Sequence, residues 1–559
     1  MPEDIGGTAW AKFSANGDRL IAFLEKGRLS IVGIFVYVIL LAFGRDMAEY
    51  VLLDPSFLVG GNPWIYSIAE HCAFYVVVFL GLVLLLTAFS GRGFRKALNL
   101  ITSIYWIILL PPFLDHFLFG DNQGYAYFSW TDLVNAFFHF SGESFHPGQG
   151  LEVATFLFAL FAYVIWTQRN NLFFLKERAE TLLRVGFLIL FTIVSMFIMA
   201  TPGAYLPVGV VNGSQVFPYF DQTKFYQFHL FLFMYYLLAG LLLVTVISYM
   251  AMKRSFRRMI TSMRPFQTLL FGMVVAGGIV VGWKSVNTSL VFSITTSPYW
   301  VNIEFVVMSV ASALIAWQVS TIWNDISDSR FDDPGKEGRA IASGVVNRTT
   351  VLQGSIVLMI VALVVAYLLS PIEFLILAAV FILSFLYSFR PVRFKNYTMS
   401  SVMVGLGAFL AFVYGFLTPF SVVDTQYSYD KPINYLTGAV DVAPLDISAI
   451  VIGLIIFLGL VIGSMVTDLD GYEEDRRAGV RTIYTTLGIE RGLKVVSALI
   501  FVASLTTLEL FDGRTDLIIF PVLGAAAAIT FYRYRNPKIV MALALLGFVY
   551  ATFRYLGMI

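Results

Sequence analysis

Two short acidic stretches in the second half of the chain contain the residue types that could do chemistry. The first extends from Trp323 to Gly344, and the second from Thr467 to Thr482. Each stretch directly follows an apolar segment of the length that crosses a membrane. Because a carboxylate is costly inside a bilayer, acidic residues at such positions indicate a functional site. The two stretches are therefore the first candidates for the chemistry of this protein.

Within the stretches, the carboxylates recur at helical spacing. Asp325, Asp328 and Asp332 fall at positions i, i+3 and i+7, which predicts that they share one face of a helix. Asp468 and Asp475 repeat the i, i+7 spacing. Two carboxylate faces in one membrane cavity would repel each other unless a positive charge lies between them. Since Mg²⁺ typically bridges one or two carboxylates to phosphate oxygens, the spacing predicts a membrane enzyme that binds a diphosphate through Mg²⁺.

The composition agrees with a membrane protein. Hydrophobic residues make up 58% of the chain, charged residues 13%, and the mean hydropathy is +0.79. A soluble domain contains about 25% charged residues. We expect membrane lipid around the protein and no nucleic-acid partner. Cys72 is the single cysteine, which excludes a disulfide within the chain.

The hydropathy pattern predicts an all-α polytopic protein with about fifteen spans, each near the roughly 20 residues that a bilayer requires. These spans are expected at residues 29–45, 64–90, 97–117, 150–168, 181–201, 226–252, 266–283, 302–323, 352–370, 372–389, 401–420, 447–466, 493–511, 515–532 and 538–556. Residues 10–28 are expected to form a helix on the membrane surface. The pair Pro111-Pro112 predicts a kink in the third span.

Basic residues predict the orientation and the division of the chain. Groups of Lys and Arg follow every second span, whereas the opposite loops hold scattered examples such as Arg45. Since cytoplasmic loops are enriched in Lys and Arg, we expect the N-terminus and both acidic stretches on the cytoplasmic side of a cell membrane. The longest polar break between spans six and seven begins at Lys253. It predicts a six-helix module over residues 1–253 and a nine-helix module over residues 254–559.

The residues around the carboxylates narrow the class of enzyme. The first stretch contains the pattern N-D-x-x-D-x-x-x-D at Asn324, Asp325, Asp328 and Asp332. It continues with Arg339, Ile341, Ser343 and Gly344. The second stretch contributes Asp468, Glu473, Asp475, Arg476, Gly479, Arg481 and Thr482. Further matching positions are Arg264-Pro265 before the seventh span and the set Tyr387, Ser388, Pro391 and Lys395 after the tenth.

In these motifs, their spacing and the number of helices, residues 255–559 resemble the UbiA superfamily of intramembrane prenyltransferases. The resemblance implies a nine-helix bundle that transfers a prenyl group from an isoprenoid diphosphate to a lipophilic acceptor with Mg²⁺. Three positions depart from the family pattern. Ala340 replaces a proline of the first motif. In the second motif, Gly471 replaces the second aspartate, although Asp470 is adjacent, and Glu474 replaces the glycine.

The resemblance also implies roles for individual residues. The metal and the diphosphate would be held by the carboxylates Asp325, Asp328, Asp332, Asp468, Asp475 and Glu473. The substrate would be bound by Asn324, Lys336, Arg339, Arg264, Tyr387, Lys395, Arg476 and Arg481. Arginine suits phosphate because its planar fork donates two parallel hydrogen bonds. Aromatic faces would shield the allylic cation left by departure of the diphosphate.

Several alternatives remain open from the sequence. The acceptor could be the precursor of an archaeal-type ether lipid, a quinone precursor or a carotenoid-like polyene. The C-terminal module could instead be a catalytically weakened lipid-binding module, which Gly471 favours. A membrane transporter with an acidic ion path is a third reading. Such transporters place their sites near the midplane on broken helices, whereas these carboxylates lie at helix ends.

The N-terminal module resembles no family, but it contains all five histidines of the chain. These are His71, His116, His139, His146 and His229. The predicted topology puts all five near its outer face, and His139, Glu143 and His146 fall at i, i+4 and i+7. A metal or haem site, a proton-linked or quinone-like site, and scaffold histidines without chemistry are the three interpretations.

Overall fold

The computed structural model describes residues 5–27, 29–53, 64–120, 125, 146–169, 175–200, 209–211, 214–216, 225–252, 256–285, 299–329, 341, 344, 346–397, 399–427, 447–555 and 557. The chain divides into two compact units, Met1–Phe256 and Arg257–Ile559. Nearly all described residues are helical. A bilayer favours this outcome because a helix satisfies every backbone N–H and C=O group within its own segment.

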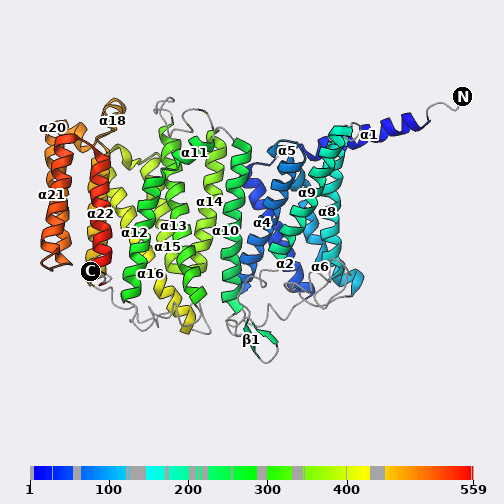
Figure 1. Ribbon diagram of the computed structural model, residues 1–559, viewed down its shortest axis with the longest axis horizontal. Helices are drawn as coiled ribbons and strands as arrows, with labels where there is room; N and C mark the ends of the chain where they lie inside the picture. Colours follow the sequence, from blue (N-terminus) through cyan, green and yellow to red (C-terminus); the bar gives the residue numbers. More distant parts are fainter. Residues whose placement is uncertain are drawn as a thin grey trace. The chain divides into compact units, whose positions relative to one another are not determined.

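Most long helices of the N-terminal unit run side by side, whereas the first extends away from the others (Figure 1). Their bounds are α1 (Ile5–Leu24), α2 (Ile31–Leu52), α4 (Trp64–Phe89), α8 (Pro147–Thr167), α9 (Leu175–Ala200) and α10 (Phe225–Met252). A small antiparallel hairpin, β1 (Gly209–Val211) and β2 (Ser214–Val216), pairs Val210 with Gln215. Helix α4 packs against both α2 and α10, so these three helices form the centre of the unit.

The third span of this unit is a composite. It consists of α5 (Phe94–Ile104), a 3₁₀ turn η1 (Tyr105–Leu109), α6 (Leu110–Leu114) and a π turn η2 (Asp115–Phe119). Pro111 and Pro112 lie in the first turn of α6, where their missing N–H groups cost least. The predicted kink therefore takes the form of a change in helix type on both sides of the two prolines.

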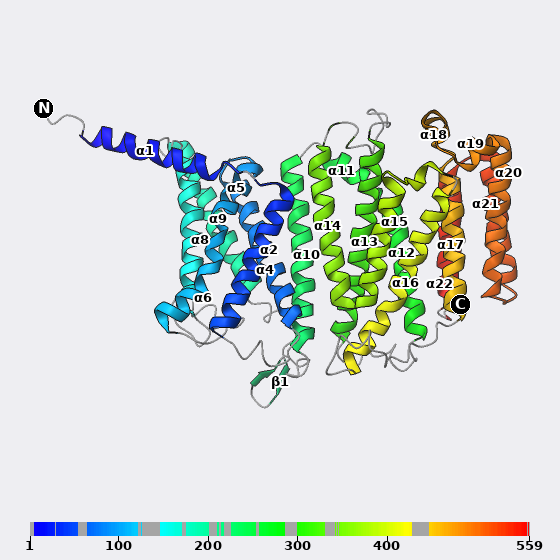
Figure 2. The same cartoon turned by 180° about the vertical axis from the view of Figure 1, so that it is seen from behind.

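The C-terminal unit has nine long helices in its described part (Figure 2). They are α12 (Pro265–Ser285), α13 (Tyr299–Asp328), α14 (Arg348–Leu369), α15 (Pro371–Ser388), α16 (Ser400–Tyr427), α17 (Ile447–Thr467), α20 (Ile489–Thr506), α21 (Asp516–Tyr534) and α22 (Pro537–Tyr555). Shorter elements are α11 (Phe256–Ser262), η8 (Phe394–Asn396), α18 (Tyr472–Ala478), α19 (Ile483–Leu487) and η10 (Thr507–Glu509).

The predicted class, an all-α polytopic membrane protein, is confirmed. Fourteen helices of the described residues are long and apolar enough to cross a membrane. The expected span at 181–201 is present as α9 but is not among these fourteen. One expected boundary is wrong. The first span does not end at residue 45, because α2 continues to Leu52 and encloses Arg45 as a buried residue.

Helices α12 and α16 approach each other backbone to backbone. A Cβ atom on Gly278 would lie 2.2 Å from the carbonyl oxygen of Phe412, and one on Gly282 would lie 2.2 Å from that of Phe416. On the opposite helix, a Cβ on Gly415 would lie 2.1 Å from the carbonyl oxygen of Val275. Small residues at such a spacing let membrane helices pack closely. We call this contact the glycine seam.

Candidate functional site

Helix α13 presents the first two carboxylates of the first acidic stretch. Asp325 and Asp328 lie one turn apart in its last turns, and both are buried. The helix ends at Asp328, with Ser329 in a turn. The predicted helical face thus includes Asp325 and Asp328. Asp332, Lys336 and Arg339 lie outside the described residues.

Both buried carboxylates contact basic side chains from other parts of the C-terminal unit. Arg264, directly before α12, donates from Nη2 to Oδ1 of Asp325 at 2.6 Å. Arg393 donates from Nη2 to Oδ1 of Asp328 at 3.1 Å, and the ammonium of Lys395 donates to the other oxygen. Such charge-assisted bonds are stronger than neutral ones. Positive charge from two separate turns therefore converges on the first stretch.

The two arginines are held in an uncommon backbone conformation. Arg264 has φ of 49° and Arg393 has φ of 46°, in the left-handed region that few residues other than glycine adopt. Conformations of this kind cost roughly 1–3 kcal/mol and cluster at functional sites. The two turns aim their arginines at Asp325 and Asp328 despite this cost.

The second acidic stretch is divided between a turn and a short helix. Asp468 follows the end of α17 at Thr467, whereas Asp475 lies on α18, which begins at Tyr472. The i, i+7 spacing therefore does not place these two residues on the face of one helix, and that expectation is wrong. Gly471, in the turn between them, has room around it, since a Cβ atom there would lie 3.5 Å from Oδ2 of Asp475.

Electrostatic contacts bring the two stretches together. Tyr387, near the end of α15, interacts with carboxylates of both stretches, namely Asp328, Asp468 and Asp475. Lys395, which binds Asp328, also attracts Asp468. In addition, the backbone N–H of Arg481 donates to the carbonyl of Asn396 at 3.2 Å. The turn after α15 thus joins the first stretch to the second.

Asp468 carries the clearest sign of uncompensated charge. Burial raises the pKa of Asp468 to about 7, and repulsion from Asp475 adds to the rise, whereas Lys395 opposes it. Burial also raises the pKa of the nearby Tyr484 above its usual value, with Asp468 contributing. A carboxylate in this situation gains from a nearby cation.

The other predicted residues of the second stretch face outward. Glu473, Arg476 and Arg481 are exposed, in contrast to the buried pair Asp325 and Asp328. The expected roles of Glu473 as a metal ligand and of the two arginines as phosphate ligands are not tested by this arrangement.

Two residues of the site were not predicted from the sequence. Arg393 belongs to one of the basic groups that follow every second span, and it lies between Pro391 and Lys395 of the motif after α15. Its position two residues before Lys395 is the sequence feature that could have indicated a role in the site. Tyr484 is fully buried, and its hydroxyl has no hydrogen-bond partner among the described residues. Nothing in its spacing marks it, because its approach to Asp468 depends on the packing of α19.

The oxygen donors of the site fit a hard divalent cation. The side-chain oxygen of Asn324 is buried and accepts no hydrogen bond from the described residues. It adjoins Asp325, while Asp468 and Asp475 repel each other. Amide and carboxylate oxygens of this kind are the ligands that Mg²⁺ takes. Within the described ranges, no three acidic, His or Cys side chains are already arranged as a complete metal site.

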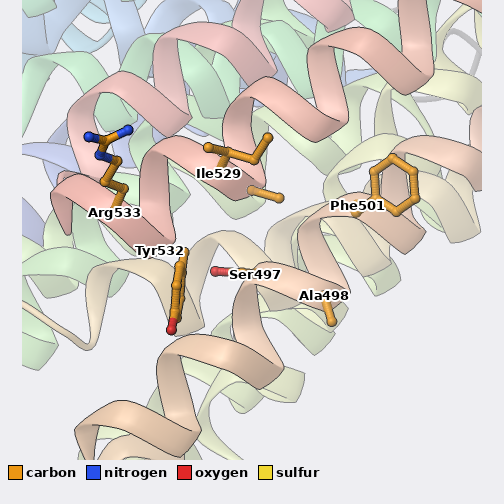
Figure 3. Close-up of a pocket in the computed structure, with 7 residues that line it drawn as sticks. Ser497, Ala498, Phe501, Ile529, Tyr532 and Arg533 are labelled. Atoms are coloured by element: carbon orange, nitrogen blue, oxygen red, sulfur yellow. The ribbon is translucent and has the colours of Figure 1, made fainter.

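A separate groove of about 460 Å³ lies between α20 and α21. Figure 3 shows Ser497, Ala498 and Phe501 of α20 across from Ile529, Tyr532 and Arg533 of α21. The residues that line this groove include none from the acidic stretches. Its apolar walls suit a hydrocarbon chain and do not suit a diphosphate.

The helices and the buried carboxylates at their ends define a multi-pass membrane protein with an acidic intramembrane site. Residues 288–541 match the model of the UbiA prenyltransferase family. The C-terminal unit therefore carries a UbiA-superfamily module, which confirms the resemblance predicted from the acidic motifs.

Solved structures with some similarity cover about the same part of the chain. A UbiA homologue from Archaeoglobus fulgidus bound to GPP and Mg²⁺ has 17% identity and a TM-score of 0.37, covering 53% of this chain and 98% of its own. A structure described as digeranylgeranylglyceryl phosphate synthase in membranes has 17% identity and a TM-score of 0.36, covering 53% and 99%. No curated protein sequence matches the chain.

Proposed function

We propose that the C-terminal unit transfers a prenyl group from an isoprenoid diphosphate to a lipophilic acceptor in a reaction that requires Mg²⁺. The observation that carries the proposal is that Asp328, Asp468 and Asp475 all interact with Tyr387, while Asp325, one turn from Asp328, binds Arg264. The family match over residues 288–541 supports the same reaction. The acceptor would be an archaeal-type ether-lipid precursor, a quinone precursor or a carotenoid-like polyene.

The basic side chains have two tasks in this proposal. Without substrate, Arg264, Arg393 and Lys395 neutralise the buried carboxylates, which would otherwise repel each other. With substrate, their N–H groups would bind phosphate oxygens, which the fork of arginine binds in pairs. Lys336 and Arg339, outside the described residues, would add to this set.

Asn324, Asp325, Asp328, Asp468 and Asp475 would hold the metal, together with Asp332 outside the described residues. Bound there, Mg²⁺ would neutralise charge on the departing diphosphate and fix its orientation. The bond between the prenyl carbon and the diphosphate oxygen breaks, and its electron pair leaves with the diphosphate. The acceptor then bonds to that carbon and loses a proton.

An aromatic pair lies below the carboxylates, along the interface of α12 and α13. The rings of Phe271 and Trp317 stack with their centroids 4.7 Å apart. Trp317 precedes Asp325 by two turns of α13, which is roughly 12 Å along the helix. Aromatic faces at this depth would contact the prenyl chain and stabilise positive charge near its reacting end.

The proposal includes the orientation and the division of labour expected from the sequence. The acidic stretches would face the cytoplasm, and residues 254–559 would contain the whole prenyltransferase. The variants Gly335→Cys and Phe145→Cys, each made without Cys72, test the orientation with an impermeant thiol reagent. Labelling of the two positions from opposite sides is expected, and labelling from the same side would contradict the layout.

The reaction itself is tested by mass spectrometry of products. Purified full-length protein in lipid would receive a set of prenyl diphosphates and the three acceptor classes, with Mg²⁺ or with a chelator. A prenylated acceptor and free diphosphate, both dependent on Mg²⁺, are expected. Diphosphate binding without product for any acceptor would favour the lipid-binding alternative, and ion flux without diphosphate binding would favour a transporter.

A further inference from the structure

The N-terminal unit contains a second group of buried ionisable residues, which lies on α2, α4 and α10. Asp46 and Glu70 have 0% of their surface exposed, and His229 has 4%. His71, with 20% of its side chain exposed, lies between the two carboxylates. Such residues are rare inside membrane spans and are retained for a function by default.

These four side chains form a chain in which carboxylates and imidazoles alternate. Nδ1 of His71 lies 3.3 Å from Oδ2 of Asp46, and Nε2 of the same ring lies 3.3 Å from Oε2 of Glu70. That oxygen of Glu70 also lies 3.2 Å from Nδ1 of His229. We call Asp46, His71, Glu70 and His229 the relay.

All four members lie near the same end of their spans. Asp46 precedes the end of α2 by six residues, and Glu70 follows the start of α4 by six, which is about 9 Å in each case. His229 follows the start of α10 by four residues, or about 6 Å. Because α2 and α10 both pack against α4, the relay runs sideways between helices at one depth and does not cross the membrane.

Other charged and titratable groups surround the relay. On α2, Arg45 pairs with Glu49 at 3.0 Å and lies 3.9 Å from Asp46. Other groups that interact with the relay or with Arg45 are Tyr50 on α2, Cys72 and Tyr75 on α4, Glu152 on α8, and Tyr125, whose ring lies 4.7 Å from the Arg45 guanidinium. Tyr125 also donates its backbone N–H to Glu49 and its hydroxyl to Asp115.

The balance of charge in this region depends on protons. Asp46, Glu49 and Glu70 carry three negative charges when ionised, and Arg45 supplies one positive charge. Two positive charges are therefore missing, and protonation of His71 and His229 supplies both. Asp115 and Glu152, when ionised, would add further negative charge and so increase the number of positive charges required. Because uncompensated charge is expensive in a low dielectric, the cluster is stable only when such protons, or an equivalent cation, are bound.

The geometry favours protons over a metal ion. A neutral imidazole has one N–H group, whereas an imidazolium has two. Each nitrogen of His71 lies 3.3 Å from a carboxylate oxygen, so a doubly protonated ring would place positive charge between two carboxylates. A metal would need one nitrogen lone pair and would disrupt one of these two contacts. Within the described ranges, no three potential ligands form a metal site.

The remaining histidines lie apart from the relay. His116 packs edge-on against Phe117, and His146 precedes α8 and packs against the ring of Tyr125. His139 and Glu143 lie outside the described residues, so the expected group of His139, Glu143 and His146 is not addressed. Of the four histidines within the described residues, the structure thus brings two together.

We propose that the relay is a proton-binding site inside the membrane, in which Asp46, His71, Glu70 and His229 share two exchangeable protons as one unit. The ring of His71 is the least buried of the four side chains, so we expect protons to enter and leave the relay there. This site is independent of the prenyltransferase proposal, because it lies in the other unit of the chain.

The test is a pH titration of the histidine rings by nuclear magnetic resonance, with ¹⁵N-labelled histidine in the full-length protein in lipid. Single His→Ala variants assign the five rings. His71 is expected to be doubly protonated at neutral pH. In Glu70→Gln, the imidazolium signals of His71 and of His229 should both disappear at a pH about one unit or more below that of the wild type, because Glu70 contacts both rings. Asp46→Asn should affect His71 more than His229.

Glu180→Gln is the matched control, since Glu180 is exposed and, among the described residues, forms its one ion pair with Arg184 in an i, i+4 contact. It should leave both titrations unchanged. Unchanged titrations of His71 and His229 in a folded Glu70→Gln protein would overturn the shared site. Metal analysis of the same samples tests whether a metal ion occupies the site instead of protons. A stoichiometric metal that is lost in His71→Ala would overturn the proposal.

Discussion

The two acidic regions compensate buried charge in different ways. In the C-terminal unit, the basic side chains Arg264, Arg393 and Lys395 contact two aspartates at the end of α13. In the N-terminal unit, the carboxylates lie within the spans and are interleaved with His71 and His229. Fixed positive charge suits a ligand that is itself strongly anionic. Histidine suits the proton as a ligand, because imidazole binds and releases a proton near neutral pH.

The comparison shows that the carboxylates of an acidic cluster in a membrane do not by themselves indicate its ligand. The basic side chains that pair with the carboxylates indicate which ligand the cluster binds. Arginine retains its charge at any physiological pH, so it can release a carboxylate only when another anion takes its place. Imidazole gains or loses its charge by binding or releasing a proton, so the carboxylate beside it can stay in place during this change.

The largest expected effect is the loss of prenyl transfer in Asp325→Asn or Asp475→Asn. Each change removes negative charge that would hold the metal and keeps the shape of the side chain. We expect turnover to fall by about 10²–10³-fold, the range seen when one preorganised electrostatic group is removed from an active site. Product formation measured by mass spectrometry checks this.

The matching control lies in the other unit. A protein in which His71, His116 and His229 are all replaced by alanine should retain most of its prenyl transfer. If a well-folded triple variant lost the reaction while its acidic stretches were intact, the separation between the two regions would be wrong.

The next largest effect concerns stability. Arg45→Ala would leave Glu49 and Asp46 without their guanidinium in a buried setting, which typically costs about 3–5 kcal/mol. We expect a large fall in the thermal stability of the protein in lipid. Arg184→Ala breaks an exposed pair of similar spacing and should cost about 0.5 kcal/mol at most. Equal effects of the two changes would show that the buried network contributes nothing special.

A smaller effect is expected at Arg393. In Arg393→Ala, Asp328 keeps Lys395 but loses one charge-assisted hydrogen bond, so Mg²⁺ meets less competition for that carboxylate. Since such a bond contributes about 1.5–3 kcal/mol, the Mg²⁺ concentration for half-maximal activity should fall by about tenfold to a hundredfold. Arg390→Ala, at an exposed position of the same turn, is the control and should leave it unchanged. A rise in the Mg²⁺ requirement of Arg393→Ala would contradict this role.

The smallest effect is expected from removal of the N-terminal unit. A chain of residues 254–559 should bind a prenyl diphosphate with Mg²⁺ as the full chain does, because all proposed ligands lie within it. Calorimetric titration of the two proteins with the same diphosphate compares them. Loss of binding by a folded fragment would mean that the N-terminal unit contributes to the donor site.

Much of the fold was predictable because a bilayer leaves few choices. Apolar runs near 20 residues must form helices, and the expected spans agree with the observed ones to within several residues. The first span shows where this reasoning fails. Hydropathy treats Arg45, Asp46 and Glu49 as markers of a loop, whereas mutual pairing lets α2 continue through them to Leu52.

The site was predictable in its motifs but not in its pairings. The sequence identifies Asp325 and Asp328 through their spacing, and α13 bears this out. That Arg393 binds Asp328 depends on how the turn after α15 meets the end of α13, which no local pattern encodes. Likewise, the relay joins residues 46 and 229, whose separation in sequence hides their contact.

The glycine seam limits how this protein can vary. The sequence of an interface made of leucines and valines can change, because a larger side chain on one helix can be compensated by a smaller one on the other. Between α12 and α16 no such exchange exists, because the atoms that meet Gly278, Gly282 and Gly415 belong to the opposite backbone. In a saturation-mutagenesis library these three positions should accept almost no substitution, whereas Gly407, with nothing within 4 Å of its Cβ position, should accept alanine. Because the seam fixes the position of α12, Arg264, directly before that helix, should keep its contact with Asp325 even when the surrounding sequence changes.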